Sequence, residues 1–447
     1  MSDQQLLSLL GDLLADARKA GADAADAVAV DGTSLSVAFR LGNPEKVERA
    51  EGSDIGLRVF VGQRQAIVSS ADRSRQALAE LVERAVAMAR EVPEDPYCGL
   101  ASPDQLAKHL PEIDNYDPIE PTATTLVDWA RRAEDAARAV PGVTNSEGAE
   151  AGWGSSLVAM AASNGFSRLY RSSHSQIVAS VLAGDTASGM ERDYDYHTVV
   201  FGADLRTPED IGQAAGTRAV KRLGARKMPT GKLPVVFDPR VSGGILGHLA
   251  GAINGGAIAR GTSFLKDKLG QQILPKGMNV IDDPHRKRGL RSKPCDGEGV
   301  ANRRRAIVED GVLTSWILDL RSARQLSMPS TGHASRGTSS PPSPSVSNFY
   351  LEPGSRSVKE LIADIQEGFY VTELIGMGVN GVTGDYSRGA AGFWIEKGEI
   401  VFPVNEMTIA SNLKHMFLNL SAADDLLFKS GIDAPTLRID GMTIAGA

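Results

Sequence analysis

The chain has 447 residues, more than one ordinary hydrophobic core accommodates, so its length predicts two or three domains. Hydrophobic residues make up 42% and charged residues 23%, a balance that excludes the disordered and fibrous classes. The formal net charge of -7 opposes nucleic acid and anionic lipid, so we expect neither nucleic acid nor a membrane as a partner.

Cysteine usage and the N-terminal residues bear on the compartment. Only Cys98 and Cys295 occur, so a disulfide framework is implausible and a reducing compartment is expected. Residues 1–7 lack the basic region and cleavage site of an export signal. The uncharged stretch 241–259 holds six glycines and is a poor membrane span. We therefore expect a cytoplasmic protein.

The first part of the chain, residues 1–115, is predicted to form an N-terminal α/β domain. Apolar residues from Leu6 to Ala17 recur at helical spacing, and so do those between Arg73 and Arg90. Asp31-Gly32 is a turn signal. Short strands separated by such turns are predicted between the two helices, at 27–30, 35–39, 56–61 and 65–69.

Proline and acidic residues gather at 92–96 and again at 116–121, which indicates a linker between units. Beyond it we predict a middle α+β domain over residues 116–228. Its elements are a helix at about 125–140, strands near 155–160, 167–170 and 176–182, and a helix at about 210–223.

The remaining residues, 229–447, are predicted to form a C-terminal β-rich domain with one glycine-laden helix near 241–259. The stretch 327–347 is rich in Ser, Pro and Gly, and we expect it to be a mobile surface loop. The fold class expected for the whole chain is α+β.

The run Gly376–Gly381 matches the glycine-rich pattern of dinucleotide sites, which requires a helix to begin there and hold the pyrophosphate. No helix pattern follows. The next residues read instead as a hairpin with a turn at Lys397-Gly398, so we interpret these glycines as turn residues.

The sequence gives little support for a catalytic serine or cysteine nucleophile or for a metal site. No GxSxG occurs, and acidic neighbours would raise the pKa of the Cys295 thiol. Asp283, His285, Cys295, Asp296 and Glu298 fit no standard zinc spacing, so a solvated turn is favoured over a metal cluster. The basic run at 285–293 is interpreted as a solvated loop rather than a nucleic-acid patch.

Within the glycine-laden helix, Gly247, Gly251 and Gly255 recur every fourth residue on one face, where another backbone can approach closely. His248 stands alone, because no second histidine or carboxylate lies one turn away. We expect a packed or hydrogen-bonded histidine rather than a metal ligand.

Five stretches carry a resemblance along nearly the whole chain. By it the sequence is identified as a member of the TldD/PmbA family (peptidase family U62), and it is similar to the PmbA/TldE-type subunit. The matching stretches are residues 52–62, 260–265, 296–299, 310–313 and, most clearly, 369–413.

The resemblance implies where a metal site would lie. In the zinc-bearing TldD-type subunit an HExxxH motif precedes the Arg-Gly-Thr-Ser sequence, and a late cysteine adds a ligand. Here the three motif positions fall on Leu246, Gly247 and Gly251, and no cysteine follows Cys295. The resemblance thus implies no catalytic and no metal-binding residue in this chain, with the zinc in a partner subunit.

The function implied is that of a non-catalytic subunit paired with a TldD-type subunit, as a heterodimer or higher assembly. The implied complex acts on unfolded peptides, in proteolysis or in processing of peptide antibiotics or antitoxins. Two alternatives stay open. One is an autonomous hydrolase with residues around Asp283, His285 and Glu298, and the other is a scaffold or regulator without peptidase association.

Overall fold

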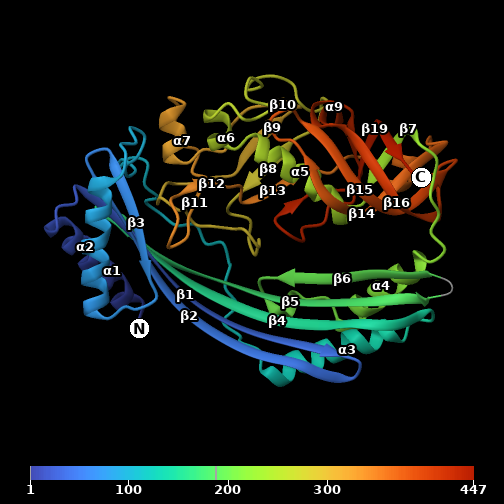
Figure 1. Ribbon diagram of the computed structural model, residues 1–447, viewed down its shortest axis with the longest axis horizontal. Helices are drawn as coiled ribbons and strands as arrows, with labels where there is room; N and C mark the ends of the chain where they lie inside the picture. The colour runs from blue at the N-terminus through green and yellow to red at the C-terminus, as the bar shows by residue number, and fades with distance from the viewer. Residues whose placement is uncertain (1, 187–188, 447) are drawn as a thin grey trace.

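An antiparallel six-stranded sheet runs along the lower half of Figure 1 and is built from the N-terminal half of the chain. The computed structural model describes residues 2–186 and 189–446. In spatial order the strands are β3 (Arg64–Ser70), β2 (Asn43–Val61), β1 (Ala24–Arg40), β4 (Val143–Ala162), β5 (Ser167–Asp185) and β6 (Gly189–Val199). Four of them have 17 to 20 residues, which at about 3.4 Å per residue makes the sheet roughly 60 Å long.

Strand β1 is continuous where the sequence predicted two strands. The predicted turn at Asp31-Gly32 is wrong, because these residues pair with Ser53 and Gly52 of β2 in an unbroken register. On its other side β1 pairs with β4 through the same point. Pairing on both sides holds the Asp-Gly step extended and overrides its local turn preference.

Alternate residues of β1 face one side of the sheet, and two helix pairs share that side. The helices are α1 (Asp3–Lys19), α2 (Arg75–Glu91), α3 (Ala123–Arg138) and α4 (Pro208–Lys221). Odd-numbered residues from Ala25 to Ala29 pack in one core with α1 and α2, and those from Leu35 to Phe39 pack in another with α3 and α4. One strand therefore serves two cores in succession. All four helices were predicted from their periodicity.

The predicted boundary between residues 115 and 116 lies in the connection between α2 and α3. Strands from either side of it meet in the same sheet, since β1 pairs with β4 over residues 26–39 and 149–162. The two N-terminal ranges are thus joined through one continuous sheet.

The C-terminal half lies across the other face of this sheet (Figure 1). Its strands are β7 (Gly231–Phe237), β8 (Val280–Asp283), β9 (Arg305–Glu309), β10 (Val312–Leu313), β11 (Ala334–Ser335), β12 (Ser343–Pro344), β13 (Asn348–Leu351), β14 (Glu367–Val379), β15 (Asp385–Glu396), β16 (Glu399–Asn412), β17 (Leu420–Ala422), β18 (Ile432–Asp433) and β19 (Leu437–Ala445). Its helices are α5 (Pro239–Ala252), α6 (Gly255–Ala259), α7 (Leu320–Gln325), α8 (Val358–Ile362) and α9 (Leu413–Leu418). In the N-terminal half, a 3-10 turn η1 (Gly202–Asp204) precedes α4.

Two sheets organise this half, in the orders β16-β15-β14-β7-β19-β17 and β10-β9-β8-β13-β18. One hydrophobic core joins both sheets with α5. The α+β class expected from the sequence is confirmed, with strands dominating the C-terminal half.

The glycine-rich run at 376–381 ends β14 and starts no helix. Gly376 has a φ of +81°, and the β14–β15 register shifts between Ile375 and Gly378. Further on, Lys397 and Gly398 have φ of 51° and 79° and turn β15 into β16, as the hairpin prediction required.

Part of the stretch 327–347, predicted as a mobile surface loop, is instead packed between the two halves of the chain, while residues 339–341 are exposed. It contains β11 and β12, and His333 is buried with its ring nitrogen Nε2 3.1 Å from Asp282. Thr338 hydrogen-bonds Asp54 of the first sheet, and its main chain lies so close to Gly56 that a Cβ there would collide. For the packed part, the prediction of a surface loop was wrong because composition does not report these long-range contacts.

Among residues 2–186 and 189–446, no helix combines the length and the apolar character needed to cross a lipid bilayer.

Candidate functional site

Helix α5 carries the three motif positions and is fixed at its start. The Asp238 carboxylate accepts a hydrogen bond from the Arg240 amide (2.9 Å), and Pro239 occupies the first turn, where its missing amide leaves nothing unpaired. Leu246 and Leu249 point into the C-terminal core, and Leu246 is only 5% exposed. The first motif position is therefore a core position.

Two of the three glycines predicted to allow close packing are not closely packed within this chain. A Cβ added at Gly247 or Gly251 would meet nothing within 4 Å. Gly255 is closely packed, with a Cβ 2.5 Å from Leu318 Cδ2, but it lies in α6. The periodicity failed because α5 ends at Ala252 and the chain turns before Gly255.

The open face of α5 borders a cavity of about 320 Å³. Its walls come from β6, the residue after α4, α5, β14 and β15, which are far apart in sequence. Four of its charged side chains are cationic and one is anionic: Arg192, Arg222, Arg240, Arg388 and Glu373. Arginines therefore outnumber carboxylates among the side chains that line this recess.

Three of these arginines are tied to carboxylates, and one of them, Arg192, pairs with Glu147. Arg222 Nη1 lies 2.5 Å from Glu373 Oε2, and Arg240 Nη2 lies 2.7 Å from Asp193 Oδ1. Arg388 differs. Its Nε donates to the Ile375 carbonyl (3.3 Å), and no carboxylate of the described residues lies within ion-pairing distance of it. Its charge stays uncompensated on the cavity wall.

His248 also lines this cavity, projecting from α5. Its ring packs edge-on against Tyr386, with centroids 5.8 Å apart, so the histidine is packed as predicted. Burial lowers the pKa of His248, and nearby Arg388 lowers that pKa further. The imidazole is therefore neutral at physiological pH.

The five residues weighed as a metal cluster do not gather around one point. Asp283 accepts the His285 amide (3.0 Å), and His285 Nε2 lies 2.7 Å from Asn302 Oδ1. Asp296 accepts the Glu298 amide (2.9 Å). Within the described part of the chain, no three or more His, Cys, Asp or Glu side chains are grouped so that they could hold a metal ion.

The alternative prediction of a solvated turn is wrong for part of this set, because Cys295, Asp296 and Glu298 are buried. Burial raises the pKa of the Cys295 thiol, and the charge of Asp296 raises it further, to about 12. That thiol is therefore protonated and a poor nucleophile.

The basic run at 285–293 packs against neighbouring segments. Arg286 lies over the Phe428 ring, 3.4 Å from its centroid. Arg288 pairs with Asp114 and Asp204, each at 2.8 Å. The charge of Arg288 is therefore paired within the chain.

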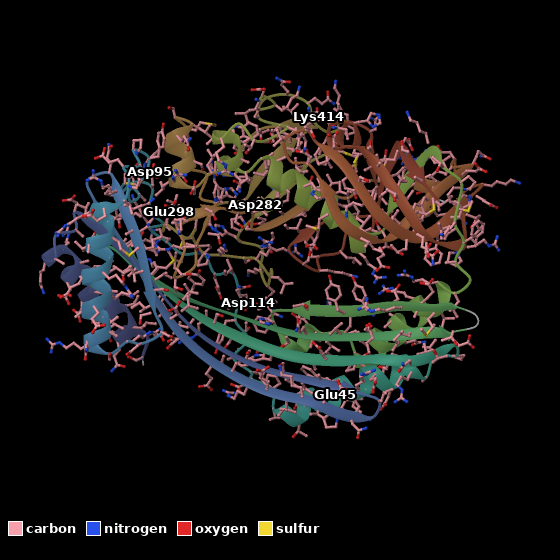
Figure 2. The ribbon with its side chains drawn as sticks, viewed as in Figure 1. Glu45, Asp95, Asp114, Asp282, Glu298 and Lys414 are labelled. Atoms are coloured by element: carbon pink, nitrogen blue, oxygen red, sulfur yellow. The ribbon has the colours of Figure 1, made fainter. Side chains whose placement is uncertain are left out.

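Glu298 belongs to a buried charge network that sequence reasoning missed. Figure 2 shows it where the C-terminal half meets the β1–β3 end of the first sheet, and its Oε1 lies 3.7 Å from Arg58 Nη1. Asp26 hydrogen-bonds Arg58 and lies 2.6 Å from Arg336 Nη1. Burial alone would raise the pKa of Asp26, but the two arginines outweigh it and lower that pKa. No local motif joins residues so far apart.

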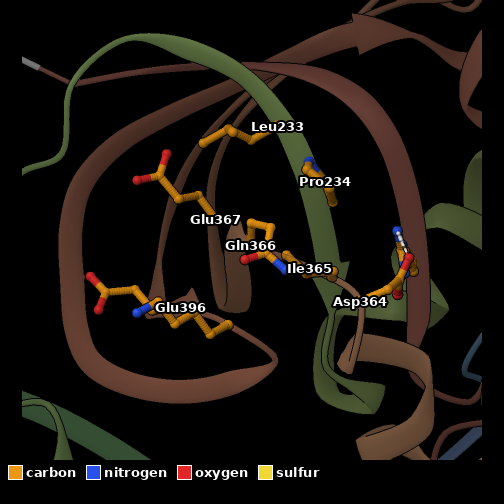
Figure 3. A pocket seen from close by; sticks show the side chains of 9 residues that line it. Leu233, Pro234, Asp364, Ile365, Gln366, Glu367 and Glu396 are labelled. Carbon is orange, nitrogen blue, oxygen red and sulfur yellow. Dashed lines mark hydrogen bonds and ion pairs between the residues drawn. The ribbon is translucent and has the colours of Figure 1, made fainter.

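A larger hollow lies elsewhere. Figure 3 shows it at the start of β7 and β14, the end of these strands opposite to α5, with a volume of about 710 Å³. Leu233, Glu367 and Glu396 line it, and Asp364 is held by Arg438 at 2.5 Å. Its acidic side chains do not converge, so we take the recess at α5 as the candidate site.

Family models match in three consecutive blocks. These are PmbA/TldA metallopeptidase domain 1 at residues 25–89, the central domain at 116–223 and the C-terminal domain at 230–446. The third block contains α5 and most of the cavity wall.

Similar proteins agree with this assignment. "Metalloprotease PmbA" of Escherichia coli O157:H7 is 39% identical over 95% of this chain and 92% of that protein. The "Metalloprotease PmbA homolog" of Haemophilus influenzae is 36% identical over 99% and 97%.

Solved structures share the whole fold. A protein of Bacteroides thetaiotaomicron, described as a proposed modulator of DNA gyrase, superposes with a TM-score of 0.91 at 26% identity and 100% coverage of both chains. TldE from Thermococcus kodakarensis superposes with a TM-score of 0.87 at 20% identity, over 98% of this chain and all of that one. With three domain models in order and relatives aligned along nearly its full length, the chain belongs to the PmbA/TldA (TldD/PmbA) metallopeptidase family.

Proposed function

We propose that this chain is the non-catalytic, PmbA/TldE-type subunit of a zinc metallopeptidase complex whose TldD-type partner carries the metal. The observation that carries the proposal is the state of the three motif positions. Leu246 is buried in the core, and Gly247 and Gly251 have no side chain that could donate to a metal.

Ligand chemistry supports the proposal. Catalytic zinc is held by three nitrogen, sulfur or oxygen donors, with a further position open for water. On this face of α5 the single donor is His248, and Arg388 stands close enough to lower its pKa. Uncompensated positive charge disfavours a divalent cation beside it. The residues present do not fit a zinc site, so we derive no catalytic step in this chain.

Unfolded peptides are the proposed substrate of the complex, in proteolysis or in maturation of peptide antibiotics or antitoxins. In this proposal the present chain lines part of an enclosed path and supports its partner. An extended peptide would gain main-chain hydrogen bonds by adding to a sheet edge, and β6 is an edge strand beside the recess. The complex is proposed to work in the cytoplasm, without nucleic acid or membrane.

The test is reconstitution with a TldD-type subunit from the same cell. We expect the two chains to co-elute with a defined stoichiometry, and the mixture to cleave an unstructured peptide far faster than either chain alone. A scaffold or regulator without peptidase association would give neither result. The control is the same mixture with the metal-binding histidines of the partner replaced, which should still co-elute but not cleave.

A further inference from the structure

The recess at α5 combines an unpaired cation with a shape that suits a small anionic group. Arg388 on β15 has no carboxylate partner among the described residues, whereas the other three arginines, Arg192, Arg222 and Arg240, are held by Glu147, Glu373 and Asp193. The volume of about 320 Å³ lies at the small end of ligand pockets, enough for one or two residues of an extended chain.

Tyr194 on β6 contacts two of the arginines that line the recess. Arg240 lies over the Tyr194 ring at 4.6 Å from its centroid, and Arg192 lies at 5.7 Å from the same centroid. These cation–π contacts, together with the ion pairs to Asp193 and Glu147, hold the two guanidinium groups in place. Two arginines are thereby positioned beside the cavity before any ligand arrives, which lowers the entropy lost on binding.

A second polar group adds to the uncompensated charge. Thr372 lines the cavity, and its hydroxyl oxygen is shielded from solvent and has no hydrogen-bond partner among the described residues. Buried hydroxyl groups are normally paired, and an unpaired one is costly. A ligand with an acceptor oxygen would satisfy both this hydroxyl and the guanidinium of Arg388.

From this geometry we infer that the recess binds a carboxylate of a peptide, with Arg388 as the principal charged contact and Thr372 as a hydroxyl donor. The identification of the ligand as a peptide rests on the proposed function. Arginine suits this role because its planar guanidinium can donate two parallel hydrogen bonds to one carboxylate. The carboxylate could be the C-terminus or an acidic side chain, since both present the same two oxygens.

Three probe peptides distinguish a C-terminal carboxylate from the carboxylate of an acidic side chain. All are unstructured chains of glycine, serine and alanine with a fluorescent label at the N-terminus. The first has a free C-terminal carboxylate, the second is amidated, and the third is amidated with one internal glutamate. Binding to the full chain alone is measured by fluorescence anisotropy, so the result does not depend on pairing with any partner.

We expect at least one carboxylate-bearing peptide to bind about tenfold or more tightly than the neutral peptide, which corresponds to about 1.4 kcal/mol. Preference for the first peptide identifies the C-terminus, and preference for the third identifies an acidic side chain. Arg388→Gln should abolish the difference, and Thr372→Val should reduce it. Equal binding of all three peptides, or no binding of any, would overturn the inference.

The matched control is Arg303→Gln, which removes an exposed arginine outside the recess and should leave all three affinities unchanged. An equal loss in Arg303→Gln and Arg388→Gln would mean that general charge attraction is responsible, and the inference would fall. Arg388 donates a single hydrogen bond to the main chain, so thermal melts of its variant should match those of the parent. If the chain fails to pair with a TldD-type subunit, the proposed function is contradicted. The peptide-binding result is not affected, because it is measured on this chain alone.

Discussion

Leu246→His places the first residue of the zinc motif at its matching position and tests whether this position is structural. Leu246 is 5% exposed and packs in the core that joins both C-terminal sheets with α5. Losing the burial of a leucine side chain costs about 1.5 to 3 kcal/mol. Burying an imidazole without a partner adds about 1 to 3 kcal/mol.

The substitution should therefore destabilise the C-terminal half by about 2.5 to 6 kcal/mol. Urea unfolding followed by tryptophan fluorescence measures this, because Trp316 and Trp394 lie in the same core. Leu246→Ala is the reference, with an expected loss of about 2 to 5 kcal/mol from the cavity alone. If Leu246→His unfolds at the urea concentration of the parent, the side chain is not held in the core and the position could face a metal.

Three further predictions concern the residues around this site and the contact between the two halves. Gly251→Ala should stabilise the protein by up to about 1 kcal/mol, measured by thermal melts, because the added methyl enters open space and alanine favours a helix; a loss of stability would show that another surface covers this face. Burial raises the pKa of Glu298, so its contribution to stability falls as pH rises above the ordinary glutamate pKa of 4.5. Glu298→Gln should make the free energy of unfolding less dependent on pH above 4.5. If that free energy changes with pH as steeply as in the parent, the pKa of Glu298 is not raised in the folded state. Gly56→Val should push against the Thr338 main chain and cost about 1 to 3 kcal/mol, seen as faster proteolysis between the two halves; cleavage at the rate of the parent would mean that this contact does not hold them together.

Restoring all three motif residues, by Leu246→His, Gly247→Glu and Gly251→His, is expected to give an unstable variant that binds zinc weakly. The reason is the buried Leu246 position together with the missing late cysteine, and not crowding at Gly251, where a Cβ meets nothing within 4 Å. Position 251 is open because the helix turns its core face, with Leu246 and Leu249, the other way.

Elements with local signals could be predicted from the sequence. Helices α1 to α4 have apolar residues at helical spacing and cap residues such as Ser2 and Thr207, so their positions follow from nearby residues alone. The long strand β1 could not be predicted as one strand, because its extended Asp31-Gly32 step depends on pairing with two distant strands.

The candidate site was also beyond local patterns. Its walls meet from positions 192, 222, 240–248 and 372–388, and no spacing rule connects a lone arginine at 388 with a histidine at 248. The family resemblance placed the three motif positions on α5, which borders the recess. The cluster of four arginines could not be predicted from the sequence, because only the fold brings these residues together.

Zinc content of the purified chain tests the central claim most directly. After incubation with excess zinc and removal of free metal, we expect far less than one zinc ion per chain and no hydrolysis of an unstructured peptide, because α5 has a buried leucine and two glycines at the three motif positions. Stoichiometric zinc together with hydrolysis that a chelator abolishes would contradict it.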